Sequence, residues 1–199
     1  MNHLAHAWLA MPDDDIVLGG LMADFLRGAV DPQLPRGVRI GIALHRAIDG
    51  YTDAHPQVVA ARRLFEPPYR RYAGILIDVW FDHLLARRWT RHADGSVASF
   101  SQHVQRLLAA RDVELPPRLQ DFARYMRRHD LPAAYQDVET IDRVFNGLSH
   151  RLSRENPLAT ARPVLAAQSD ALEHAFAQFF PQLAAFSAGE VARIEARLA

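Results

Sequence analysis

The segment from Tyr72 to Trp89 constrains the fold more than any other part of the chain. It reads YAGILIDVWFDHLLARRW, and almost every residue before the arginines is apolar. A helix that is apolar nearly all round is typical of a buried core helix. Asp78 and Asp82 lie four residues apart and would share one face of that helix. Because buried carboxylates are costly unless they are paired, hydrogen-bonded or bound to a metal, we expect either arginine partners or a divalent cation beside them.

The remaining chain also reads as helices separated by proline and glycine breaks. No segment alternates between apolar and polar residues over the length of a strand. The pattern predicts an all-α protein, a single domain over residues 1–199 forming a compact bundle of roughly eight to ten helices. The expected helices span residues 2–10, 16–27, 36–53, 57–65, 72–89, 97–110, 116–129, 133–150 and 158–180, followed by a last helix N-capped by Ser187, with Glu190 completing a capping box.

Composition and charge exclude several functional classes. Lys+Arg and Asp+Glu both number 23, so the formal net charge is zero, and we expect no nucleic-acid partner. There is no cysteine, which rules out a thiolate nucleophile and a cysteine metal site. No apolar run reaches the roughly 18 residues of a membrane span, and the first residues lack the basic leader of a signal peptide. We therefore expect a cytoplasmic protein with no membrane partner.

Histidines and acids recur inside apolar helical context, but only in the first 83 residues. Histidine and carboxylate ligands without cysteine suit Mn²⁺, Fe²⁺, Mg²⁺ or Zn²⁺, and such a centre can activate water and hold a phosphoryl oxygen. No G-x-S-x-G motif, P-loop or G-x-G-x-x-G motif supports another chemistry. The alternative is a non-enzymatic helical binding protein in which the acids form ion pairs. The residues concerned are His6, Asp24, His45, Asp49, Asp78, Asp82 and His83.

Several short blocks carry a resemblance to one bacterial family. The sequence resembles the acyl carrier protein phosphodiesterases, most clearly over its first 90 residues or so and in general character to its end. The matching blocks are NHLAH (residues 2–6), GGLMADFLRG (19–28), HRAID (45–49) with Thr52-Asp53, and DVWFDH (78–83), with a weaker block VFNGL (144–148) and Arg151.

The resemblance implies a reaction and a cofactor. Members of this family cleave the phosphodiester that joins 4′-phosphopantetheine to a serine of holo-acyl carrier protein. They depend on a divalent metal, with Mn²⁺ favoured over Mg²⁺ or Fe²⁺, and are atypical relatives of the HD-domain metal phosphohydrolases. This chain departs from the HD pattern, because its adjacent pair runs Asp82-His83 rather than His-Asp. A phosphohydrolase of the same architecture acting on a small phosphodiester or nucleotide is the alternative.

The two arguments together give a set of candidate site residues. We expect Asp24, His6 and Asp49 to be catalytic and Arg46 to bind phosphate. The expected metal ligands are Asp24, His45, Asp78, Asp82 and His83. Acyl carrier proteins are acidic, so a cationic docking face is also needed. The arginine pairs near the site in sequence supply one, namely Arg62, Arg63, Arg70 and Arg71.

Overall fold

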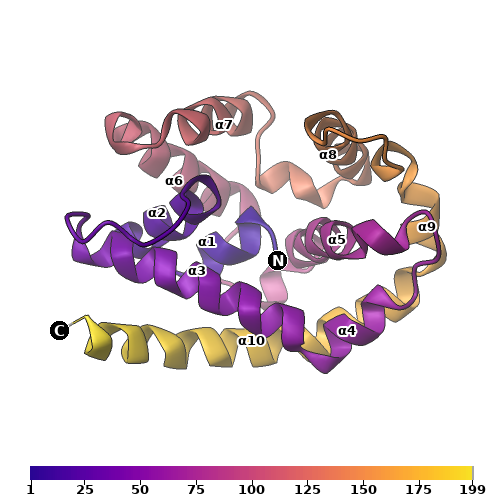
Figure 1. Ribbon diagram of the computed structural model, residues 1–199, viewed down its shortest axis with the longest axis horizontal. Helices are drawn as coiled ribbons and strands as arrows, with labels where there is room; N and C mark the ends of the chain where they lie inside the picture. Colours follow the sequence, from indigo (N-terminus) through magenta and orange to yellow (C-terminus); the bar gives the residue numbers. More distant parts are fainter. Residues whose placement is uncertain (199) are drawn as a thin grey trace.

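The computed structural model describes residues 1–198 and confirms the all-α prediction. Within this range the chain forms helices joined by turns and short 3-10 segments, with no strand (Figure 1). None of the helices in the described range combines the length and the apolar character that crossing a bilayer requires. The α-helices are α1 (His3–Leu9), α2 (Asp14–Met22), α3 (Arg36–Ala54), α4 (Pro56–Arg62), α5 (Ala73–Arg87), α6 (Val97–Ala110), α7 (Pro117–Arg128), α8 (Val138–Arg151), α9 (Arg162–Ala167) and α10 (Ser169–Arg197).

Helix α5 lies inside the bundle, as its composition predicts. It packs against α1, α4, α8 and α10, and its large apolar residues other than Ile75 are almost completely buried. Phe81 is fully buried and packs its ring against Phe176 and Phe179 of α10, with centroid distances of 5.4 and 5.9 Å. Aromatic pairs at such distances contribute beyond simple area burial. The long helix α10 thus closes one side of the core, along the lower edge of Figure 1.

Helices α2 and α3 cross unusually closely through glycines. A Cβ atom added to Gly19 would lie 2.1 Å from the carbonyl oxygen of Val38, and one added to Gly41 would lie 2.1 Å from that of Ile16. Only glycine permits backbones to approach this closely. The crossing brings the end of α2, where a 3-10 turn carries Asp24, beside the middle of α3, which carries His45.

The two acids of α5 hold the beginning of the chain. Asp82 is fully buried and accepts hydrogen bonds from the backbone N–H groups of Leu4 (2.8 Å), Asn2 (3.2 Å) and Ala5 (3.4 Å). It therefore satisfies the free donors at the first turn of α1, where a negative charge is also favoured by the helix dipole. Asp78 accepts a hydrogen bond from the ammonium group of Met1 at 2.9 Å. These contacts fix α1 against α5.

The C-terminal prediction was wrong. Instead of a helix ending at Phe180 and another N-capped by Ser187, α10 runs without interruption from Ser169 to Arg197. Ser187 is buried inside it and donates its hydroxyl hydrogen to the carbonyl oxygen of Leu9 at 3.2 Å. Glu190, expected in a capping box, instead forms ion pairs with arginines one and two turns further on. The Ser-x-x-Glu pattern therefore serves one tertiary contact, through Ser187, and ion pairs within α10, through Glu190, rather than a helix start.

Three other predicted helices are divided. The one expected over residues 16–27 ends as α2 at Met22 and is followed by a 3-10 turn, Ala23–Phe25. The other two lie in the second half of the chain. The expected helix over residues 133–150 is a 3-10 turn, Ala133–Gln136, followed by α8. Residues 158–180 begin with a 3-10 turn and α9 before α10 starts. Of these two, the first is divided at Asp137, where the backbone is extended. In the second, α9 starts with Pro163 in its first turn and ends before Gln168.

Candidate metal centre

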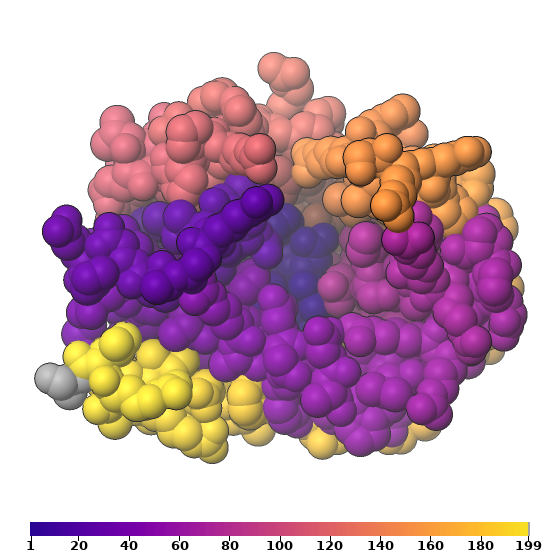
Figure 2. Space-filling view, in the orientation of Figure 1, coloured from indigo at the N-terminus to yellow at the C-terminus, as the bar shows by residue number. Residues whose placement is uncertain are grey.

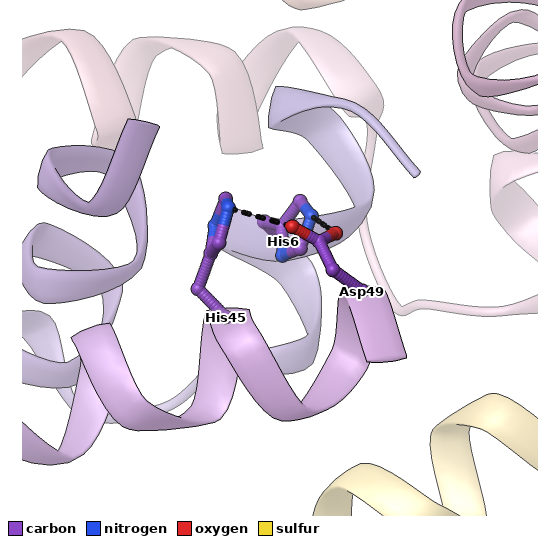
Figure 3. A group of neighbouring side chains, drawn as sticks. All are labelled: His6, His45 and Asp49. Atoms are coloured by element: carbon purple, nitrogen blue, oxygen red, sulfur yellow. Dashed lines mark hydrogen bonds and ion pairs between the residues drawn. The ribbon is translucent and has the colours of Figure 1, made fainter. Parts of the chain in front are cut away.

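Three side chains from two helices meet at the inner end of a pocket (Figure 3). Helix α1 supplies His6, while α3 supplies His45 and Asp49, which are one helical turn apart. The two carboxylate oxygens of Asp49 lie 3.1 Å from Nε2 of His6 and 3.2 Å from Nε2 of His45. The imidazole rings stack with centroids 3.8 Å apart and planes 18° apart. One ligand atom from each residue lies within 4.8 Å of the others, a spacing that a single ion could bridge.

Asp24 and His3 extend this cluster towards the opening. One oxygen of Asp24 lies 3.2 Å from Nε2 of His45, and the other lies 3.7 Å from Nδ1 of His3. The side chains of His6 and His45 are only 3% and 7% exposed, whereas those of Asp24 and Asp49 are each 47% exposed. The two imidazole rings are therefore shielded from solvent, whereas the two carboxylates are half exposed.

The environment sets different charges on neighbouring groups. Burial lowers the pKa of His6 to about 4. Burial also opposes the charged form of His45, but hydrogen bonds with Asp24 and Asp49 overcome this and raise its pKa to about 9. Although burial disfavours the Asp49 carboxylate, bonds from His45 and His6 hold its pKa far below the usual range. At neutral pH two carboxylates thus share one imidazolium, and a divalent cation could replace that proton.

The donor set suits a divalent cation. Both histidines direct Nε2 at the same carboxylate, and their buried Nδ1 atoms have no hydrogen-bond partner. Two imidazole nitrogens with the carboxylate of Asp49, and a second carboxylate, Asp24, 3.2 Å from His45, match the mixed shells of Mn²⁺, Fe²⁺ or Zn²⁺. The half-exposed carboxylates also leave one side of the cluster open to a ligand from the pocket. Geometry therefore supports a site of the open, catalytic kind rather than a closed structural one.

The pocket above the cluster has a volume of about 330 Å³. Figure 2 shows it as a hollow with the N-terminal segment at its floor and α8 on its rim. One side is polar and carries His3, Asp24, His45 and Asp49. The other side is largely apolar and is formed by α5, α8 and the segment before α8, through residues Ile75, Val79, Leu131, Val144 and Leu148. Phe122 of α7 also lines the pocket and packs its ring against that of His3, with centroids 4.5 Å apart. The pocket could therefore hold an elongated molecule with one charged end.

The structure separates the remaining predicted site residues from this cluster. Asp78 lines the pocket but is paired with the Met1 ammonium. Asp82 lies beneath α1. His83 is buried on another side of α5, with Nδ1 2.7 Å from the carbonyl oxygen of Tyr135. Arg46 donates to the carbonyl oxygen of Gly28 at 2.9 Å and lines a different cavity.

The structure adds residues that sequence reasoning did not place in the site. The sequence feature that could have identified His3 is its spacing of three residues from His6 on the same predicted helix. Tyr135 and Arg151 come from the second half of the chain and reach the pocket only through the fold. One sequence feature pointed to Arg151, namely its position just after the weaker of the matching sequence blocks.

The four arginines expected to bind a partner line one surface cleft. We call it the arginine cleft; its lining residues are Val59, Arg62, Arg63, Arg70, Arg71, Ala73 and Gly74. Arg62 also forms an ion pair with Asp53, which lines the pocket above the cluster. The cleft and the pocket are therefore neighbours joined by one ion pair.

Comparison with known proteins now decides the family. The family model described as acyl carrier protein phosphodiesterase matches residues 1–183. The chain belongs to the acyl carrier protein phosphodiesterase family. A relative with that name from Salmonella agona (strain SL483) is 36% identical over 189 residues, covering 94% of this chain and 98% of its own. One from Enterobacter sp. (strain 638) is 35% identical over 184 residues, covering 92% and 95%.

No solved structure matches the chain. The relation of this acyl carrier protein phosphodiesterase family member to the HD-domain phosphohydrolases therefore stays a prediction. The family match spans both α1 and α3, which supply the histidine–carboxylate cluster, and α8, which also lines the pocket.

Proposed function

We propose that this chain is a metal-dependent hydrolase that releases 4′-phosphopantetheine from holo-acyl carrier protein in the cytoplasm. Membership of the acyl carrier protein phosphodiesterase family is the observation that carries the proposal. The cluster of His6, His45 and Asp49, with Asp24 beside His45 at the pocket, supplies chemistry suited to it. The described helices share one hydrophobic core, which supports a single catalytic domain.

The proposed metal ligands are His6, His45 and Asp49, with Asp24 completing the shell. Asp78 and Asp82 then act as supports, because they fix α1 and with it His6. Mn²⁺ is the proposed ion, with Mg²⁺ and Fe²⁺ as alternatives, since all three accept carboxylate-rich shells. A divalent ion held here would supply positive charge for the phosphoryl oxygens and favour ionisation of water.

The proposed reaction is displacement at phosphorus by water. An O–P bond forms to the water, and the bond between phosphorus and the carrier serine oxygen breaks. Asp24 is half exposed at the pocket, and its pKa is held low by His45 and His3 despite partial burial, so its carboxylate can accept the proton of the attacking water. His3 lies 3.7 Å from Asp24 and can pass that proton to the leaving serine oxygen. The products are a carrier with a free serine hydroxyl and 4′-phosphopantetheine.

The arginine cleft is the proposed docking site for the carrier protein. Its guanidinium groups remain charged at all relevant pH values, and complementary charge speeds the encounter with an acidic partner. Three of its arginines are exposed, and Arg62 is half-buried and paired with Asp53. Because Asp53 also lines the pocket, a carrier bound here would place its prosthetic arm close to the metal ligands.

Conversion of holo-carrier to apo-carrier tests the proposed function. The chain is incubated with holo-acyl carrier protein and Mn²⁺. One control reaction contains EDTA in place of Mn²⁺, and a second uses the Asp24→Ala variant with Mn²⁺. We expect conversion only with the intact chain and metal. Hydrolysis of bis(p-nitrophenyl) phosphate without any action on the carrier would favour a small-phosphodiester hydrolase instead. A melting temperature that ignores Mn²⁺, with no hydrolysis, would favour a binding protein.

Metal binding tests the ligand set separately. We expect Asp49→Asn to weaken Mn²⁺ binding at least tenfold, because the amide removes the charge between the two imidazoles. Asp53→Asn, on the same helix and lining the same pocket but outside the cluster, is the matched control and should change Mn²⁺ affinity less than threefold. Equal effects of the two substitutions would contradict the assignment.

A further inference from the structure

We propose that Arg151 binds the phosphoryl oxygens of the substrate from the α8 side of the pocket. The inference rests on the proposed function and deepens it, because it names the protein group that holds the phosphodiester. Arg151 is the last residue of α8 and lines the same pocket as His45 and Asp49. Helix α3, which carries His45 and Asp49, and helix α8 both line the pocket. An anion held between them would contact both.

The charges lining the pocket make such a group necessary. The lining includes the carboxylates of Asp24, Asp49, Asp53 and Asp78. Asp53 and Asp78 are paired with Arg62 and the Met1 ammonium. One divalent ion would therefore balance the charges of Asp24 and Asp49 and leave no excess positive charge for a phosphodiester anion. The Met1 ammonium also lines the pocket, but it is hydrogen-bonded to Asp78. A second, uncommitted cation is therefore needed for the anion to enter.

Arg151 is the uncommitted cation. It is exposed, and among residues 1–198 no carboxylate lies within ion-pair distance of it, in contrast to Arg62, which pairs with Asp53. A guanidinium presents parallel N–H donors that match two oxygens of a phosphate group. The only other arginine proposed for phosphate, Arg46, directs its guanidinium at the carbonyl oxygen of Gly28 and away from this pocket.

The neighbours of Arg151 place it near the reacting end of the pocket. Arg151 lines the same pocket as His3 and Tyr135, so it shares the pocket with a residue of the polar wall as well as with its own wall. Tyr135 is almost fully buried, and its hydroxyl oxygen lies 3.4 Å from Nδ2 of Asn2. This contact joins the turn before α8 to the residue preceding α1. Arg151 thus lines the pocket together with the segment that precedes α1, which carries His6 of the cluster.

Binding of 4′-phosphopantetheine to the Mn²⁺-loaded chain tests the proposal without turnover. Calorimetry would compare the wild type with Arg151→Gln, Arg151→Lys and the control Arg154→Gln, an exposed arginine three residues further on that does not line the pocket. We expect Arg151→Gln to weaken binding at least tenfold, Arg151→Lys to restore part of the loss, and Arg154→Gln to stay within twofold. Mn²⁺ affinity and melting temperature should not change in any variant.

Kinetics with holo-carrier provide the second readout. Arg151→Gln should lower kcat/KM at least tenfold, while Arg154→Gln should leave it unchanged. Equal binding of 4′-phosphopantetheine by Arg151→Gln and Arg154→Gln would overturn the role of Arg151, as would a wild type that does not bind it at all. A wild type that binds 4′-phosphopantetheine through Arg151 yet does not cleave the carrier would instead refute the proposed function alone.

Discussion

The glycine crossing of α2 and α3 offers a quantitative test of how the site is built. In Gly41→Ala the new Cβ would lie 2.1 Å from the carbonyl oxygen of Ile16, 2.8 Å from the nitrogen of Gly20 and 2.9 Å from Cα of Gly19. All three contacts are with backbone atoms, and ordinary contacts begin at 3.4 Å. No side-chain rotation can relieve them, so the helices must move apart by about 1 Å.

That separation should lower stability and loosen the metal centre together. Overpacking of this kind costs about 1–3 kcal/mol, while alanine in place of a helical glycine returns up to about 1 kcal/mol. Because the obstruction is rigid backbone, we expect a net loss of about 2 kcal/mol. Asp24 follows α2 directly, so its 3.2 Å contact with His45 should lengthen, and Mn²⁺ affinity should fall about tenfold.

Gly50→Ala is the matched control. Gly50 lies on the same helix with nothing within 4 Å of an added Cβ, so this substitution should stabilise the chain by about 0.5–1 kcal/mol. Urea denaturation of the metal-free proteins and Mn²⁺ titration measure both effects. If the Gly41→Ala variant were as stable as Gly50→Ala and bound Mn²⁺ with unchanged affinity, the close crossing would not be what positions Asp24.

Three further predictions follow from contacts around the site. In the metal-free chain the pKa of His45 is raised from 6.5 to about 9. The stability that protonated His45 gives to the folded state is therefore fully present below pH 6.5 and is lost as pH rises through 9. The loss in the free energy of unfolding should reach at most about 3 kcal/mol. Thermal melts across this range should show it, and His45→Gln should show a smaller loss, because the pKa of the Met1 ammonium is also raised. Asp82→Asn places donors against backbone N–H groups and should lower the melting temperature, with much less loss of Mn²⁺ affinity than Asp49→Asn; equal losses would make Asp82 a ligand. Reversing charge at the exposed arginines of the arginine cleft should raise KM for holo-carrier more than it lowers kcat, and an unchanged KM would remove this docking site; the residues are Arg63, Arg70 and Arg71.

The sequence was sufficient to predict the helical class and the buried character of α5. It also predicted the part of the site whose residues share a helix or a short motif. His45 and Asp49 are four residues apart on α3, and an i,i+4 pair in an apolar helix already indicates a common face. His6 and Asp24 were identifiable as polar residues in apolar surroundings, and the structure brings both to that face.

The partners of buried acids could not be predicted in this way. Asp78 and Asp82 needed compensation, but the sequence suggested arginines or a metal, whereas the structure supplies the Met1 ammonium and backbone N–H groups of α1. Every residue carries a backbone N–H group, so such a partner leaves no mark in the sequence. Arg151 stands beside the weaker of the matching sequence blocks, but it is more than a hundred residues away in the chain from the metal centre, and the packing of α8 against α5 is what brings it to the pocket.

The most direct test of the central claim is the intact mass of the carrier protein and of the released 4′-phosphopantetheine after reaction in ¹⁸O-labelled water. Hydrolysis at phosphorus by this metal centre predicts apo-carrier with an unlabelled serine and one ¹⁸O atom in the released phosphate. The reaction should require Mn²⁺ and be lost in Asp49→Asn. A label on the carrier serine, a dehydroalanine carrier from elimination, or full conversion in EDTA would contradict the account.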